Sequence, residues 1–196
     1  MTAEAPSAAG AVAEHRAALD AVETLLPAVG DLAARLVDCF TAGGRVLSFG
    51  NGGSACDAQH LTEELVARYR RERRALPATC LSSDPSVLTC VGNDFGFAEL
   101  FARQVQAHAR PGDIVCAFTT SGRSENIVRG LAAAREAGAT AALFGGGDGG
   151  DALAHADHAL VIPSRATARV QEMHVLLVHL LIEPVDAWAA GEEAAA

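Results

Sequence analysis

The 196-residue sequence contains no lysine, and its 15 basic residues are all arginine. This absence excludes Schiff-base enzymes, pyridoxal-phosphate enzymes and Walker-type phosphate loops, because each of them requires a lysine amine. Any phosphate group that this chain binds is therefore expected to be held by backbone N–H groups, hydroxyl groups or arginine side chains.

No stretch of the sequence resembles a secretory signal or a membrane-spanning run, and we expect neither. Residues 1–6 contain no basic segment, and the apolar run over residues 175–182 is far shorter than the roughly 20 residues that a span needs. The five cysteines are odd in number, and no two of them have the two-residue gap of a metal knuckle or redox motif. We therefore expect reduced, mostly buried cysteines in a cytoplasmic protein that does not bind membranes.

Positive charge is scarce as well, since the net charge is −9 at pH 7. A strongly acidic chain is a poor ligand for nucleic acid, and we expect no nucleic-acid partner. Half of the residues are apolar and 20% are charged, which is typical of a globular protein with a sizeable core.

What the sequence does contain is an alternation of short β-prone runs with helical stretches. The β-prone runs cover residues 45–49, 76–81, 114–118, 140–144 and 159–162. Helical patterns cover residues 55–70, 97–108, 124–137 and 166–189, and Pro184 is expected to kink or break the last of them. Two amphipathic helices are expected in the first 43 residues, broken near Pro27 and Gly30. This alternation predicts an α/β fold with a parallel sheet, in which the loops after the strands share one ligand-binding edge.

Two of these loops have the composition of a phosphate site. Residues 50–54 read Gly-Asn-Gly-Gly-Ser, and residues 119–124 read Thr-Thr-Ser-Gly-Arg-Ser. Glycine allows a close backbone approach, the helix that follows offers unpaired N–H groups, and serine and threonine add hydroxyl donors. Glycine and serine are also ordinary turn and cap residues, but two such loops on one sheet edge favour a lysine-free phosphate cradle.

Two polar positions on the expected helices allow more than one interpretation. His60 and Glu64 are four residues apart and share one helix face, which suits metal binding or proton transfer but, on spacing alone, better suits a plain surface pair. His179 interrupts the apolar run over residues 175–182 and is expected to be buried with a partner. A core histidine and a functional histidine are equal alternatives there.

Five motifs taken together resemble one protein family. They are Gly-Asn-Gly-Gly-Ser-Ala-Cys-Asp-Ala-Gln-His at 50–60, Glu-Glu-Leu at 63–65, Val-Gly-Asn-Asp-Phe-Gly at 91–96, Thr-Ser-Gly-Arg-Ser at 120–124 and Ala-Arg-Val-Gln-Glu at 168–172. In order and spacing they resemble the phosphoheptose isomerases of the sugar isomerase (SIS) domain superfamily, over residues 35–185. The resemblance implies a flavodoxin-like α/β three-layer sandwich with a five-stranded parallel sheet flanked by helices. We accordingly divide the chain into an N-terminal helical segment (1–34), a SIS domain (35–190) and a flexible tail (191–196).

The resemblance also implies an activity and a site. The family converts sedoheptulose 7-phosphate into D-glycero-D-manno-heptose 7-phosphate, typically as a homotetramer with active sites at subunit interfaces and often with zinc. Its metal ligands match His60, Glu64, Gln171 and His179, and its proton-transfer residues match Glu64 and His179. Its substrate contacts match Asn51, Gly52, Gly53, Ser54, Glu64, Asn93, Asp94, Thr119, Thr120, Ser121, Ser124 and Gln171.

The chain departs from the family pattern in the second loop, where Thr119 replaces serine and Arg123 replaces asparagine. Thr119 keeps the hydroxyl group, whereas Arg123 adds a cation beside the phosphate and leaves the exact sugar open. A related SIS protein that binds the bacterial replication initiator is a rival interpretation, but it is expected to carry asparagine where this chain has His179. A sugar-sensing transcription regulator is disfavoured, because no helix-turn-helix segment accompanies the domain.

Helix geometry leads to an expectation about assembly. Gln171 and His179 are eight residues apart on one expected helix, which separates them by about 12 Å along its axis and about 80° around it. Zinc–nitrogen and zinc–oxygen bonds are only about 2 Å long, so these two side chains can hardly meet at one ion from the same straight helix. If both serve one site, one of them comes from a neighbouring copy. We therefore expect an obligate homo-oligomer with shared active sites, in line with the tetramer that the resemblance implies.

Overall fold

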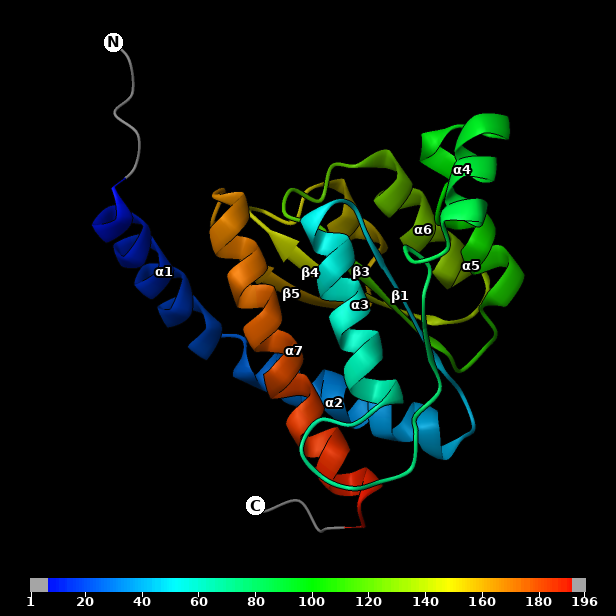
Figure 1. Cartoon of the computed structure of the whole chain (residues 1–196), viewed down its shortest axis with the longest axis horizontal. Helices are drawn as coiled ribbons and strands as arrows, with labels where there is room; N and C mark the ends of the chain where they lie inside the picture. The colour runs from blue at the N-terminus through cyan, green and yellow to red at the C-terminus, as the bar shows by residue number, and fades with distance from the viewer. Residues whose placement is uncertain (1–6, 192–196) are drawn as a thin grey trace.

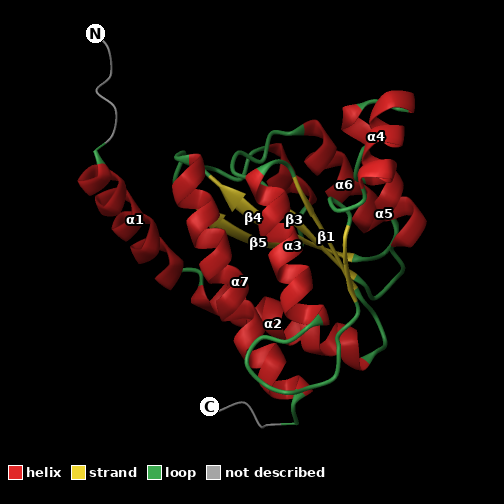
Figure 2. Cartoon of the chain, viewed as in Figure 1, coloured by secondary structure: helices red, strands yellow, loops and turns green. Residues whose placement is uncertain are grey.

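The computed structural model describes residues 7–191, so the predicted tail lies outside the described residues except for Gly191. Its centre is a single sheet of five parallel strands, in the order β2-β1-β3-β4-β5 (Figure 2). The strands are β1 (Val46–Gly50), β2 (Ala78–Cys80), β3 (Ile114–Phe118), β4 (Thr140–Gly146) and β5 (His158–Ile162). The predicted five-stranded parallel sheet is confirmed. Because β1 and β3 are neighbours, the loops that follow them meet where the strand order reverses, which is the usual ligand site of such sheets.

Helices cover both faces of the sheet and complete a three-layer sandwich (Figure 1). One face carries α2 (Leu26–Thr41), α3 (Gly53–Val66) and α7 (Thr167–Ala189), and α1 (Ala8–Glu23) packs against α7. The other face carries α5 (Ala102–His108) and α6 (Glu125–Glu136), with α4 (Pro85–Asp94) and two short 3-10 helices, Phe97–Glu99 and Asp151–His155, beside them.

Two apolar cores lie on opposite faces of the sheet, and side chains along β1 alternate between them. Val46 belongs to the apolar cluster under α2, α3 and α7, whereas Leu47 and Phe49 belong to the cluster under α5 and α6. Every residue of β1 and β3 is buried, as expected for central strands of a parallel sheet with both faces covered. The positions of the cradle loops are therefore determined by a sheet that is packed on both sides.

Several predicted helix boundaries were wrong. The first two helices separate at residues 24–25, while Pro27 lies in the first turn of α2 and Gly30 lies inside that helix. Proline is tolerated in a first turn because its missing N–H has no partner there in any case. Pro184 does not break the last helix, since α7 continues to Ala189. The stretch predicted as one helix over 97–108 is a 3-10 turn followed by α5.

Two differences concern the region around the site. Helix α3 begins at Gly53 and ends at Val66, whereas the prediction was 55–70, so the arginine-rich segment after it is a loop. Helix α4 was not predicted, although Asp84 caps it by accepting the backbone N–H groups of Ser86 and Val87. None of the described helices is long and apolar enough to cross a membrane.

Candidate active site

The first predicted loop turns the chain from β1 into α3. Gly52 has a φ of 56°, a left-handed conformation that favours glycine. A Cβ atom on Gly53 would collide with the side-chain amide of Gln171, so the missing side chain allows α3 and α7 to approach each other. The Asn51 amide exchanges two hydrogen bonds with the Asn126 amide, at 2.9 and 2.8 Å. This pair joins the first loop to the start of α6.

The second predicted loop turns the chain from β3 into α6. The Thr119 hydroxyl accepts the backbone N–H of Gly122 at 3.1 Å, and Gly122 has a φ of 66°. The Ser121 hydroxyl accepts the backbone N–H of Arg123 at 3.3 Å. Ser124 occupies the N-cap of α6, and its side chain makes no capping bond. That hydroxyl is therefore available to a ligand.

The two loops enclose a cavity of about 210 Å³ between the first turns of α3, α6 and α7. Its walls are Asn51, Gly53, Ser54, Phe118, Thr119, Thr120, Ser121, Ser124, Thr167 and Gln171. None of these side chains is charged, and hydroxyl groups and helix N-termini are the groups that bind phosphate without lysine. We call these residues the cradle.

Four predicted substrate residues lie outside the cradle, and one of them, Glu64, belongs to the group described next. Gly52 lines a neighbouring cavity of about 280 Å³ with Phe97, Phe101 and residues of α4. Asn93 and Asp94 are exposed at the end of α4, where the Asn93 amide donates to the Asp94 carboxylate at 2.6 Å, and neither lines the cradle.

A second group of polar side chains lies between α3 and α7. The ring Nε2 atom of His60 is 3.1 Å from Glu64 Oε1 and 3.3 Å from His179 Nε2, and His179 Nε2 is 3.8 Å from the same Glu64 oxygen. One donor atom from each residue lies within 4.8 Å of the others. These three residues are called the cluster below. The spacing of His60 and Glu64 alone favoured a plain surface pair, but the structure adds a third ligand-type residue from another helix.

The cluster is half-enclosed. The Glu64 side chain is 12% exposed, and those of His60 and His179 are 28% and 37% exposed. Tyr69 packs beside His179, with 5.6 Å between ring centroids. Burial, followed by the nearby charge of Glu183, raises the pKa of the Tyr69 hydroxyl above its usual value.

His179 is therefore not the buried histidine that its apolar neighbours indicated. The fully buried histidine of α7 is His174, whose Nε2 lies 3.2 Å from the backbone oxygen of Gly145 and whose Nδ1 faces Asp57 at 3.6 Å. The 3.6-residue period explains the error, because an apolar run on a helix has a side that faces the core and a side that does not. The same period turns His179 toward α3.

Gln171 lies with the cradle and not with the cluster of its own chain. Its amide contacts the position of Gly53, and it lines the cradle cavity, whose walls include none of the three cluster residues. This agrees with the separation of about 12 Å along the helix that follows from eight residues of rise. Of the four predicted metal ligands, the structure brings together His60, Glu64 and His179.

Arg123 does not point a free cation at the cradle. Its guanidinium binds both oxygens of Asp148, at 3.0 and 2.8 Å. A hydrogen bond from the Gly150 backbone, followed by the charge of Arg123, lowers the pKa of the Asp148 carboxyl. This pair lines a cavity of about 320 Å³ beside the cradle, together with Arg165.

The five thiols are free. Cys39, Cys80 and Cys116 are buried, while Cys56 and Cys90 are exposed. Burial raises the pKa of Cys39 to about 11 and that of Cys116 to about 12, which makes both poor nucleophiles.

Besides the cradle walls Phe118 and Thr167, three residues near the site were not identified from the sequence. Asn126 pairs with Asn51, Tyr69 packs on His179, and Asp57 faces His174 beneath the cradle. Asn126 offered a usable signal, because it lies in the first turn of the helix that follows the second loop. The other two depend on contacts between distant segments that no local pattern reveals.

Comparison with known proteins connects this geometry to one family. A family model described as SIS domain matches residues 12–145. A phosphoheptose isomerase of Paramagnetospirillum magneticum is 53% identical over 154 residues, which is 79% of this chain and 80% of that protein. One of Aquifex aeolicus is 47% identical over 165 residues, which is 84% of this chain and 86% of that protein. The solved structure of a phosphoheptose isomerase from Neisseria gonorrhoeae superposes with a TM-score of 0.85 at 36% identity, covering 91% of this chain and 96% of the other.

Proposed function

The chain belongs to the phosphoheptose isomerase family of SIS-domain proteins, and on that premise we propose that it interconverts sedoheptulose 7-phosphate and D-glycero-D-manno-heptose 7-phosphate through an enediol. The observation that carries this proposal is the presence of two separate parts, an uncharged cradle and a His–Glu–His cluster. An aldose–ketose isomerase needs both, because one part must anchor the phosphate while the other moves a proton between adjacent carbons.

The cradle is proposed to hold the phosphate group. Ser54, Thr120, Ser121 and Ser124 would donate hydroxyl hydrogen bonds, and the first turns of α3 and α6 would add backbone N–H groups with a favourable dipole. The amide pair of Asn51 and Asn126 ties the two loops together. Because no cationic side chain lines the cavity, the anion would be recognised chiefly by oriented dipoles.

The cluster is proposed to carry the proton transfer. Glu64 is the base that takes the carbon-bound proton, and His179 is the acid that serves the sugar oxygens or assists ring opening. A histidine is suited to this role near neutral pH, and a positioned base of this kind contributes about 10²–10⁴-fold to the rate. His60 contacts both partners and would hold them in place.

The donor set of the cluster fits a zinc ion. Two imidazole nitrogens and a carboxylate oxygen converge within 4.8 Å, and three such protein ligands with one open position are typical of catalytic zinc. His60, Glu64 and His179 would hold the metal, and Gln171 would have to come from a neighbouring copy to join them. When bound, zinc would polarise the sugar carbonyl and stabilise negative charge on the oxygens. Glu64 as a ligand would be less basic, so metal dependence and the identity of the base are linked questions.

The assembly and location are part of the same proposal. We propose a homo-oligomer, a tetramer by analogy with the family, in which the cradle of one chain serves the cluster of another. The support is the position of Gln171 at the cradle and not at its own cluster. The five free cysteines favour a reducing compartment, which supports a cytoplasmic location.

The decisive experiment is to identify by NMR the product formed from sedoheptulose 7-phosphate, with and without a chelator. We expect the aldoheptose 7-phosphate, with slower turnover after metal removal. Unchanged turnover after complete metal removal would eliminate zinc from the proposal but leave Glu64 as base. No turnover under either condition would favour the replication-initiator regulator, and binding to that initiator would then be the next measurement.

A further inference from the structure

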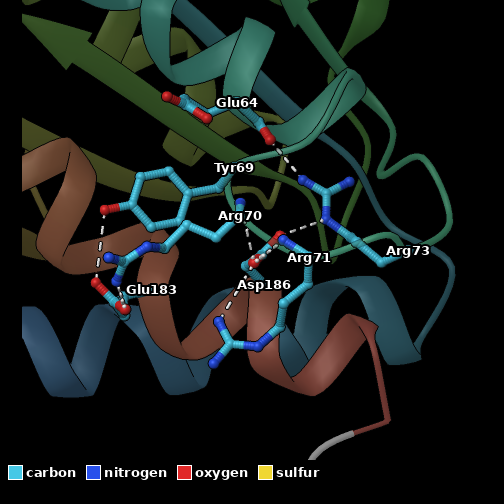
Figure 3. Close-up of polar contacts among 7 residues, drawn as sticks. All are labelled: Glu64, Tyr69, Arg70, Arg71, Arg73, Glu183 and Asp186. Atoms are coloured by element: carbon cyan, nitrogen blue, oxygen red, sulfur yellow. Dashed lines mark hydrogen bonds and ion pairs between the residues drawn. The ribbon is translucent and has the colours of Figure 1, made fainter.

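The loop after α3 contains an arginine, Arg73, whose side chain is fully buried. The side chains of Arg73 and Asp186 are both 0% exposed, and Arg73 Nε donates to Asp186 Oδ1 at 3.0 Å. Two buried charges are costly unless each is paired and hydrogen-bonded. This pair meets that condition, as Figure 3 shows.

The remaining donors of Arg73 bind the end of α3. Its Nη2 donates to the backbone oxygen of Glu64, and its Nη1 donates to that of Leu65 at 2.9 Å. Nη1 also donates to the backbone oxygens of Ala67 and Arg74, at 3.4 and 2.9 Å. The last carbonyl groups of a helix have no partner within it, and a cation is favourable at that end. Arg73 therefore caps the turn of α3 that carries Glu64.

Asp186 joins this cap to α7. Its second oxygen accepts the backbone N–H groups of Arg70 and Arg71, at 3.3 and 3.0 Å. Asp186 follows His179 by seven residues, which is about two helical turns, so both side chains lie on the same face of α7. Arg73 thus links the backbone of Glu64 to Asp186, the backbone of α7 links Asp186 to His179, and His179 Nε2 lies 3.8 Å from the Glu64 carboxylate.

We propose that Arg73 and Asp186 are positioning residues for the reaction, which hold the end of α3 against α7 and so determine the spacing between Glu64 and His179. Neither touches the cradle cavity, so phosphate binding should not depend on them. The proposal rests on the function proposed above for the cluster. Displacing reacting groups by 1 Å can cost about 10²-fold in rate, and losing a residue that orients metal ligands typically costs about 10–100-fold in metal affinity or activity.

The test uses two variants. Arg73→Lys keeps the positive charge but loses the planar guanidinium group with its several N–H donors, and Asp186→Asn keeps the shape of the side chain but loses its negative charge. The matched control is Arg70→Gln, which removes an exposed ion pair from the same loop to Glu183 on α7 without touching α3. For each protein, kcat and KM for sedoheptulose 7-phosphate, Zn²⁺ affinity after chelator treatment, and thermal unfolding are measured.

We expect kcat or Zn²⁺ affinity to fall roughly 10–100-fold in both variants, with KM changed less than about threefold. The control should stay within about twofold of wild type, because exposed ion pairs contribute little. Folded variants with wild-type kcat and Zn²⁺ affinity would overturn the proposal, even if their melting temperature fell. If Arg73→Lys does not fold, kcat and Zn²⁺ affinity of Asp186→Asn decide whether the proposal holds.

Failure of the proposed function would look different. Wild-type protein that turns over sugar but binds no Zn²⁺ would remove the metal, and the kcat comparison would still decide the role of Arg73 and Asp186. Wild-type protein that binds Zn²⁺ but does not isomerise the sugar would refute the proposed activity. In that case the comparison of Zn²⁺ affinities would decide whether Arg73 and Asp186 position the cluster.

Discussion

At the scale of single residues, the Glu64 carboxylate lies 3.1 Å from His60 Nε2 and 3.8 Å from His179 Nε2. We expect Glu64→Gln to abolish isomerisation, by at least about 10²-fold, while the fold stays intact, because the amide keeps the shape but not the proton affinity. Turnover followed by NMR and circular dichroism of the folded protein check this. Glu63→Gln, which changes an exposed neighbour, should stay near wild type. Near wild-type turnover in Glu64→Gln would remove Glu64 from the role of base.

The cradle hydroxyl groups make a second prediction at this scale. Ser54→Ala and Ser121→Ala should each weaken binding of the phosphorylated sugar, since each deletes a donor that faces the cavity. A hydrogen bond to a charged group is worth about 1.5–3 kcal/mol, or roughly ten- to a hundredfold in affinity. KM for the sugar and inhibition by inorganic phosphate measure the loss.

Ser86→Ala is the control for these variants, because Ser86 is exposed and lies outside the cradle. If both cradle variants keep wild-type KM and kcat, the assignment of the cradle is wrong.

At the scale of elements, the loop between α3 and β2 is attached to α7 by Asp186. Burial raises the pKa of this carboxyl, but hydrogen bonds from the Arg71 backbone and the Arg73 side chain outweigh it, so the net pKa lies below the ordinary value of 3.8. In the acid range the unfolded chain therefore binds a proton that the folded chain does not, and stability falls as pH is lowered through that range. Above about pH 5 the contribution is nearly complete.

The expected result is a weaker pH dependence of stability in Asp186→Asn. Between about pH 5 and pH 3 its urea midpoint should fall less steeply than that of wild type. The slope of the unfolding free energy against pH should differ by an amount that corresponds to at most about one proton taken up on unfolding. Asp148→Asn is the comparison, since Asp148 also has a lowered pKa but its side chain is 60% exposed, and solvent screening should make its effect smaller. Equal slopes in wild type and Asp186→Asn would contradict the prediction.

The elements also show how far the sequence alone leads. The strand positions were predictable, because β1 and β3 are short runs of buried apolar residues that lead directly into the two loops. Helix α4 was missed although Asp84 and Pro85 carry an ordinary start signal. The early end of α3 was not predictable from its own residues. It depends on Arg73, nine residues after Glu64, which takes the last carbonyl groups of the helix.

The candidate site likewise has one part that the sequence predicts and one part that it does not. Both cradle loops followed from local composition and from their place after strands, and the structure brings them into one cavity. The grouping of His60 and Glu64 with His179 joins residues more than 100 positions apart, so periodicity could not establish it and only the family resemblance indicated it. The burial of His174 instead of His179 was decided by the rotation of α7 against the sheet, which no single helix encodes.

At the scale of the whole molecule, the remaining question is whether one chain contains a complete site. The structure places Glu64 and His179 in the same cluster of one chain, so mixing Glu64→Gln with His179→Asn should not restore activity. This mixture therefore serves as the negative control. The informative mixture combines one chain with a defective cluster and another with a defective cradle.

Ser121→Asp supplies the defective cradle, because it places a negative charge at an exposed position that lines the cavity proposed to hold the phosphate. If each site combines the cradle of one chain with the cluster of another, subunit exchange with Glu64→Gln chains should restore activity at about a quarter of the sites, as expected for random pairing in a symmetric assembly.

Turnover after exchange, with the oligomeric state measured by light scattering, checks this. Sites complete within one chain would show no recovery, and a fully active monomer would likewise exclude shared sites. Recovery in this mixture, with none in the control mixture, would place the cradle and the cluster of each active site on different subunits.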